Sequence, residues 1–167
     1  MNQQRIFWDE LVTSRRDARY VDLYLARTEL IDRCLKGFIA IAASSSIAGW
    51  AIIKEYSFVW AAVVAGSQVL QVVKEYLPYK TRLRALTVLS QDLNAISLSA
   101  ENHWYKVCTG TLYDDDIHDL RFDLKQRKLA ALQKAFPSAG LPQNKKLEER
   151  AERETLDYFA IYTREET

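Results

Sequence analysis

Residues 38–73 read FIAIAASSSIAGWAIIKEYSFVWAAVVAGSQVLQVV, and this stretch decides the class of fold. It contains two charged residues, Lys54 and Glu55, which lie side by side near its middle. They separate an uncharged run of 17 residues, 37–53, from another of 18 residues, 56–73. As α-helices, the runs would each span roughly 26 Å, close to the ~30 Å hydrocarbon core of a bilayer. The stretch therefore predicts two membrane spans joined by a tight turn.

The charges that flank this stretch predict its orientation. Eight basic residues lie in the flanking segments, whereas the turn contains only Lys54. The eight are Arg19, Arg27, Arg33, Lys36, Lys74, Lys80, Arg82 and Arg84. Because basic residues concentrate on the cytoplasmic side of a membrane, both termini are expected in the cytoplasm.

Small and polar residues within the two runs predict helix contacts. Gly49 follows a small residue four positions earlier, and Ala62 and Gly66 are also four apart. This spacing lets helix backbones approach closely in lipid. Gln68 and Gln71 lie three apart in the second run, and such a polar pair is expected to face another helix or water. These five residues are the predicted span-packing or polar-path positions of a homo-oligomer.

A buried hairpin inside a soluble helical bundle is the alternative interpretation. Ala and Ser are only weakly hydrophobic, and Gln68 and Gln71 fit a protein interior better than lipid. However, a buried hairpin needs other helices to cover it on all sides, and the remaining segments are charged and amphipathic. The membrane interpretation is therefore favoured, while the alternative stays open.

Apolar residues outside the central stretch recur at helical spacing. In the N-terminal segment a 4-3 repeat from Phe7 to Thr28 forms one helix face. After Pro78 a second helix is expected over residues 80–106, with a heptad seam suited to bundle packing or self-association. The seam residues are Leu86, Leu89, Leu93 and Ile96.

Two further helices are expected toward the C-terminus. The first follows a turn at Gly110, has Thr111 or Asp114 as its cap, and buries a stripe that includes Ile117 and Leu124. The second covers roughly residues 144–162, and no strand-like alternation of any length occurs. The predicted fold is therefore all-α. Its parts are an N-terminal cytoplasmic amphipathic helix (1–36), a transmembrane helical hairpin (37–76) and a cytoplasmic helical domain (77–167).

Catalytic chemistry has little support in the sequence. The strongest candidate is DDDIHD at residues 114–119, because carboxylates beside a histidine can hold a divalent metal or transfer protons. Consecutive acids are also ordinary at a helix start, and His103, at a seam position, is expected to be a hydrogen-bonded bundle histidine. We therefore predict no catalytic residue, cofactor or metal. The net charge of +1 gives no general attraction to nucleic acid, so direct nucleic-acid binding is not expected.

Two segments carry a family resemblance: LARTELIDRCLKGFIAIA, which enters the first predicted span, and VLQVVKEYLPYKTRLRAL, which leaves the second. Together with the Leu-rich helix that follows, they resemble the SLATT-type two-transmembrane effectors of bacterial nucleotide-signalled anti-phage defence. The resemblance implies a multi-pass protein of the bacterial inner membrane, triggered by a cytoplasmic sensor protein or nucleotide signal. It brings no catalytic residues with it.

The expected function is accordingly that of a non-enzymatic effector that oligomerises and perturbs or permeabilises the membrane. Two alternatives remain. The chain could be a membrane-tethered helical adaptor, or a soluble α-helical interaction protein.

Overall fold

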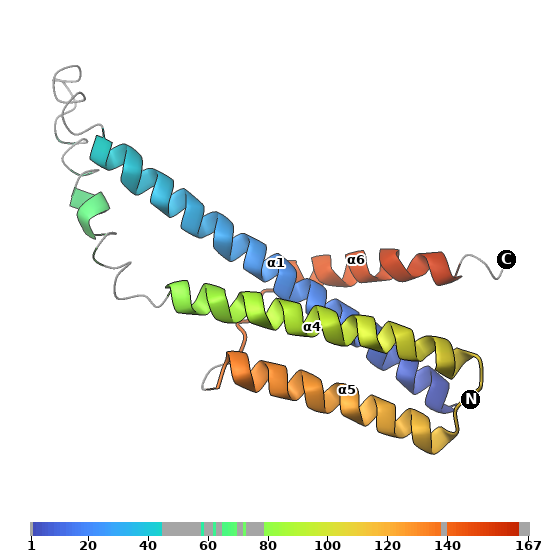
Figure 1. Ribbon diagram of the computed structural model, residues 1–167. Helices are drawn as coiled ribbons and strands as arrows, with labels where there is room; N and C mark the ends of the chain where they lie inside the picture. Colours follow the sequence, from blue (N-terminus) through green and yellow to red (C-terminus); the bar gives the residue numbers. More distant parts are fainter. Residues whose placement is uncertain are drawn as a thin grey trace. The chain divides into compact units, whose positions relative to one another are not determined.

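The computed structural model describes residues 2–44, 58, 62, 65–69, 72, 79–137 and 140–163. Every regular element within these ranges is a helix, which confirms the predicted all-α class. The long helices are α1 (Asn2–Ser44), α4 (Tyr79–Cys108), α5 (Asp114–Ala135) and α6 (Lys145–Thr163) (Figure 1). None of the described helices has the length and apolar character needed to cross a bilayer. Much of both predicted spans lies outside the described residues.

The chain divides into two compact units. Unit 1 comprises Met1–Leu25 and Arg84–Thr167, and unit 2 comprises Ala26–Leu83. Helix α1 continues without a break from the N-terminal segment into the first apolar run. The N-terminal segment therefore shares a compact unit with the C-terminal helices, although the domain boundaries predicted from the sequence separate them.

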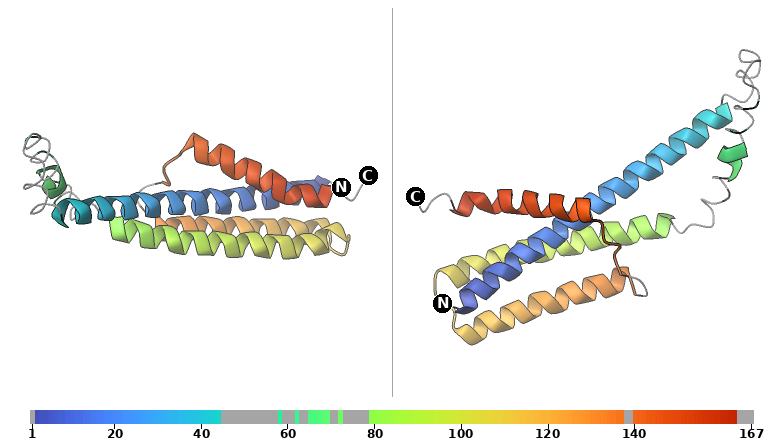
Figure 2. Two further views of the ribbon diagram at one scale, coloured as in Figure 1. Left: turned by 90° about the horizontal axis from the view of Figure 1, so that it is seen from above. Right: turned by 180° about the vertical axis from the view of Figure 1, so that it is seen from behind.

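Unit 1 is held together by a continuous apolar core. The beginning of α1 lies between α6 and the side-by-side pair formed by α4 and α5 (Figure 2). Trp8 of α1 contacts Trp104 of α4 and Phe159 of α6, with ring centroids 4.9 and 5.1 Å apart. The buried core residues are Phe7, Leu11, Ala18, Val21, Leu89, Leu93, Ile96, Ala100, Val107, Ile117, Leu124, Ala131 and Phe159. Burying a large apolar side chain of this kind contributes about 1.5–3 kcal/mol.

These buried positions agree with the helical repeats in the sequence. Phe7, Leu11 and Val21 of the N-terminal repeat are buried in this core. Ile117 and Leu124 form the predicted buried stripe of α5. The amphipathic patterns of the N-terminal segment and α5 are therefore confirmed as core-facing surfaces.

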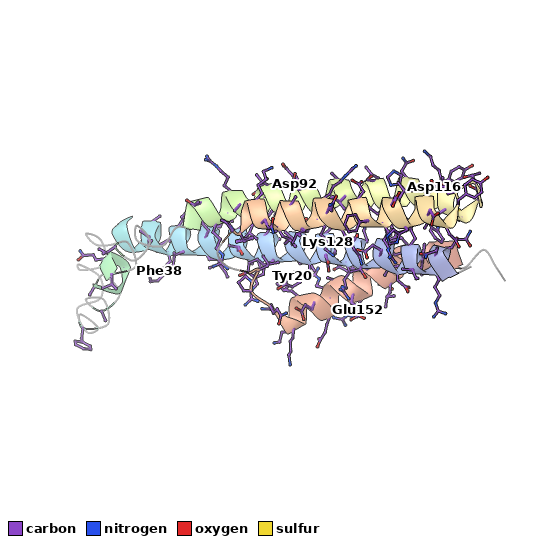
Figure 3. The ribbon with its side chains drawn as sticks, turned by 90° about the horizontal axis from the view of Figure 1, so that it is seen from below. Tyr20, Phe38, Asp92, Asp116, Lys128 and Glu152 are labelled. Carbon is purple, nitrogen blue, oxygen red and sulfur yellow. The ribbon has the colours of Figure 1, made fainter. Side chains whose placement is uncertain are left out.

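Polar contacts fix how the helices of unit 1 lie along one another. The side chain of Gln4 donates to the Val107 carbonyl oxygen at 3.0 Å, near the start of α1 and the end of α4. Toward the other end of unit 1, Asn94 of α4 donates to the Asp22 carboxylate of α1, also at 3.0 Å. Lys128 of α5 forms an ion pair with Asp17 of α1, and Figure 3 shows Lys128 between the two helices. Within unit 1, α1 and α4 therefore run antiparallel.

The turn between α4 and α5 differs in one detail from the sequence prediction. Gly110 has a φ of 69°, a left-handed conformation that glycine adopts without steric cost. Thr111 donates its hydroxyl to the Lys106 carbonyl at 2.9 Å, so it closes the end of α4 and does not cap α5. Tyr113 occupies the N-cap position of α5, and Asp114 is already helical. The predicted caps were wrong because the Thr111 hydroxyl forms its hydrogen bond with a carbonyl group at the end of α4, and Tyr113 is the N-cap of α5.

Tyr20 of α1 forms two hydrogen bonds with the loop that connects α5 and α6. The Tyr20 hydroxyl donates to the Pro142 carbonyl at 2.5 Å and accepts from the Asn144 backbone N–H at 3.1 Å. Burial raises the pKa of Tyr20, although the hydrogen bond from Asn144 acts in the opposite direction. The phenol therefore stays protonated and continues to donate over the physiological pH range.

Candidate functional site

An apolar row lies exposed on the part of α1 that belongs to unit 2. It consists of Leu30, Ile31, Cys34, Phe38 and Ile41, which we call the α1 apolar row. Four of these residues follow a 4-4-3 spacing and so share one helix face. Leu30 is 62% exposed and Ile41 is 69% exposed. In unit 1, by contrast, the same helix buries several of its apolar side chains in the core.

Some polar side chains of unit 2 are buried, whereas the α1 apolar row is exposed. Thr28 and Asp32 are only 9% exposed, and so is Ser67. The Asp32 carboxylate forms an ion pair with Lys36 one turn further on, which offsets part of the cost of burying its charge. Single exposed apolar residues are normal on protein surfaces. A row of them beside buried polar groups is instead typical of a surface that another apolar phase or protein covers.

The residues predicted to pack or line the spans lie partly outside the described chain. Gly49 and Gln71 fall outside it. Ala62, Gly66 and Gln68 are exposed. Apart from the chain neighbours and local helix backbone of Gly66, no described atom lies within 4 Å of the position that a Cβ there would occupy. Among the described residues, nothing therefore occupies the space beside Gly66, and a second helix could approach its backbone there.

The four predicted seam residues of α4 lie inside unit 1. Leu86 and Leu89 have no exposed surface, while Leu93 is 3% and Ile96 is 8% exposed. The last three belong to the core that α4 shares with α1, α5 and α6. Since this face of α4 is already covered, the seam packs within one chain and is not available for self-association.

Sequence reasoning missed a polar cleft in unit 1. Its volume is about 340 Å³, and α1, α4 and α6 all contribute to its lining. At one end, the Asp22 carboxylate accepts from the Ser90 hydroxyl at 2.5 Å and from the Asn94 amide at 3.0 Å. Both donors are neutral, so the Asp22 charge has hydrogen bonds but no cationic partner among the described residues. We call this hollow the unit 1 cleft.

A guanidinium group and a tyrosine form the other end of the unit 1 cleft. The guanidinium carbon of Arg15 lies 4.3 Å from the centre of the Tyr158 ring, a cation–π contact. The Tyr158 hydroxyl donates to the Glu101 carboxylate at 3.0 Å, which fixes the ring under the guanidinium. Within the described chain Arg15 forms no ion pair, so its N–H groups retain their capacity to donate.

The centre of the unit 1 cleft contains an ion pair and a buried hydroxyl. Arg150 and Arg19 both donate to the Glu154 carboxylate, and these hydrogen bonds lower the pKa of Glu154. Thr155 is 3% exposed, and its Oγ1 has no hydrogen-bond partner among the described residues. Ser14, which does not line the cleft, also has a buried hydroxyl without a hydrogen-bond partner in the described part of the chain. A buried hydroxyl of this kind costs about 1–3 kcal/mol unless a ligand or water completes it.

The acidic segment at the start of α5 lies elsewhere in unit 1. Asp116 and Asp119 line a hollow of about 520 Å³ together with His103 and Lys106 of α4. Burial lowers the pKa of His103, the neighbouring cations add to this effect, and Asp123 partly opposes it. Among the described residues, no group of three or more His, Cys, Asp or Glu side chains is placed to hold a metal ion.

The residues that line the unit 1 cleft left no signal in the sequence, and the one polar residue that interrupts the buried N-terminal repeat lies outside this lining. Ser14 stands within the apolar repeat of the N-terminal helix, where a hydrophobic residue would be ordinary. A polar residue at a core position indicates either a hydrogen-bonding partner or a binding site. The partners that complete the cleft come from α4 and α6, and no local spacing predicts them.

Comparison with known proteins gives no match: no protein-family profile, curated protein or solved structure is significantly similar to this chain.

Proposed function

We propose that this protein is a non-enzymatic membrane effector that attaches through unit 2, assembles with further copies and perturbs or permeabilises the bilayer. The observation that carries the proposal is the α1 apolar row beside buried Thr28 and Asp32. An exposed apolar surface of this kind is stabilised when lipid or another helix covers it.

Assembly is supported by the residues beyond the α1 apolar row. The open space beside Gly66 fits the close approach of a second helix. Gln68 is exposed, and an exposed amide within an apolar segment is best retained where it meets another helix or a polar path. The proposed site of action is the bacterial inner membrane, with both termini in the cytoplasm and a cytoplasmic sensor protein or nucleotide signal as the trigger.

Membrane attachment is tested by placing a charge in the α1 apolar row. Ile41→Asp should reduce the fraction of protein that floats with liposomes, because a carboxylate in lipid costs about 2.5–3.5 kcal/mol. Leu156→Asp is the matched control, since Leu156 is similarly exposed, at 58%, but belongs to α6 in unit 1. Equal flotation of the two variants would contradict attachment through unit 2.

Topology is tested separately with single cysteines in a background without Cys34 and Cys108. A cysteine at Glu55 should react with an impermeant reagent added to whole cells, and a cysteine at Gln143 should not. The reverse labelling pattern would contradict the proposed orientation.

Permeabilisation is tested by replacing both Gln68 and Gln71 with leucine. If the two amides line a polar path, the double variant should depolarise the membrane less than the wild type at equal membrane abundance. The measurement is a potential-sensitive dye signal after induction in cells. Equal dye signals, or no depolarisation by either protein, would exclude the effector and leave the tethered adaptor. That second candidate is favoured by the independent core of unit 1, which could serve as a docking platform.

A further inference from the structure

We infer that the unit 1 cleft binds a small zwitterion, with Arg15 holding its anionic group, Asp22 holding its ammonium or N–H group, and Thr155 completing the site. The inference does not depend on membrane attachment, because all three residues lie in unit 1. It rests on three features of the cleft: the opposite charges of Arg15 and Asp22, neither paired with an opposite charge among the described residues, a buried hydroxyl with no hydrogen-bond partner among those residues, and a volume suited to a ligand.

The charges that line the cleft select the chemistry of the ligand. Arg19 is already paired with Glu154, whereas the charges of Arg15 and Asp22 have no oppositely charged partner among the described residues. Asp157 also lines the cleft without an ion pair in the described part of the chain, but its side chain is exposed. A simple anion would be repelled by Asp22, and a simple cation would be repelled by Arg15. A molecule with both charges satisfies each end, and charge-assisted hydrogen bonds of this kind are stronger than neutral ones.

The spacing of the two charged residues sets the length of the ligand. Arg15 and Asp22 are seven positions apart on α1, so their Cα atoms are separated by about 10.5 Å along the helix axis. Side chains on one helix lean in the same direction, and much of this separation is therefore retained at their ends. The two charges of the ligand must consequently be several ångströms apart, further than in an α-amino acid.

Thr155 is the strongest sign that the cleft is a binding site. It lines the cleft together with both charged residues, and it is 97% buried with its Oγ1 unpaired among the described residues. In the interior of a folded protein, a buried hydroxyl is normally hydrogen-bonded. The volume of about 340 Å³ falls at the lower end of the range for small-molecule sites, about 300–1,000 Å³.

The test uses a series of probes that differ only in the separation of their charges. Glycine, 4-aminobutyrate and 6-aminohexanoate are titrated into the full-length protein in detergent, and binding is measured by calorimetry. Affinity should rise with chain length, and hexanoate and hexylamine, which each carry one of the two charges, should bind at least about tenfold more weakly. No binding by any zwitterion at millimolar concentration, or equal binding by a singly charged probe, would overturn the inference.

Variants assign the binding to the cleft. Arg15→Gln should weaken 6-aminohexanoate binding at least about tenfold, because a charge-assisted hydrogen bond is lost. Arg16→Gln is the matched control, since Arg16 is exposed on the same turn of α1 and is paired with Asp17. Equal losses in these two variants would indicate general electrostatic attraction and overturn the inference, as would unchanged binding by Arg15→Gln.

A third variant separates binding from folding. Thr155→Val keeps the shape of the side chain and removes only a hydroxyl without a partner, so the free energy of unfolding should not fall. Binding of 6-aminohexanoate should nevertheless weaken severalfold. If Thr155→Val destabilises the protein and leaves the affinity unchanged, the hydroxyl is structural and the cleft is not the site.

Discussion

Replacing Phe7 with alanine tests whether the N-terminal segment is part of unit 1 or a separate helix. Phe7 has no exposed surface, and its ring stacks on Trp104 of α4 with centroids 6.3 Å apart. Removing a buried Phe side chain costs about 3–5 kcal/mol, to which such an aromatic pair contributes about 0.5–1.5 kcal/mol. If residues 1–36 formed a helix of their own, the change would stay within about 0.5 kcal/mol, as at a surface position.

The assay is urea unfolding in mild detergent, followed by tryptophan fluorescence, because Trp8 and Trp104 lie beside the mutated site. Leu30→Ala is the matched control, since Leu30 is on the same helix but 62% exposed, and it should change the free energy of unfolding by no more than about 0.5 kcal/mol. A loss below about 1 kcal/mol for Phe7→Ala would refute the packing of α1 against α4.

Three further outcomes follow from the structure. The hydrogen bonds that lower the pKa of Glu154 stabilise the fold fully above its ordinary pKa of 4.5 and are lost as the pH falls below it. Glu154→Gln should therefore flatten the acid limb of the stability–pH curve, and an unchanged limb would count against the ion pair. His103 has a lowered pKa, so its protonation should destabilise the fold as the pH falls below 6.5. His103→Gln should remove this dependence, as measured by urea unfolding across that range. Gly66→Leu should shift oligomer size in mild detergent, because a leucine would fill the space beside the backbone; an unchanged size would mean that this face meets lipid.

Periodicity was sufficient to predict the helices and much of the core. The repeat that begins at Phe7 and the stripe at Ile117 and Leu124 are buried, because a helix places residues three and four apart on one face. The seam of α4 was recognised as a packing surface, but the sequence left open whether it packs within one chain or between chains. That choice depends on which helices cover the seam, and a repeat within α4 contains no information about its neighbours.

The unit 1 cleft could not be predicted for the same reason. Arg19 and Glu154 are 135 positions apart in the chain, and Asp22 and Asn94 are 72 positions apart. Charged residues on amphipathic helices are ordinarily solvated, so Arg15 and Asp22 could not be distinguished from their exposed neighbours. The exposure of the α1 apolar row could not be predicted for a different reason. Its residues lie at or just before the start of the first predicted span, and only the folded chain shows that they are exposed.

The contact between Trp8 and Trp104 gives this protein an optical signature. Two indole rings with centroids 4.9 Å apart are close enough for their transition dipoles to couple, and we expect the coupling to give a pair of bands of opposite sign in circular dichroism. One indole belongs to α1 and the other to α4, so the exciton band exists only while these two helices are packed together. Circular dichroism can therefore follow the assembly of unit 1 in liposomes or in detergent without any attached dye.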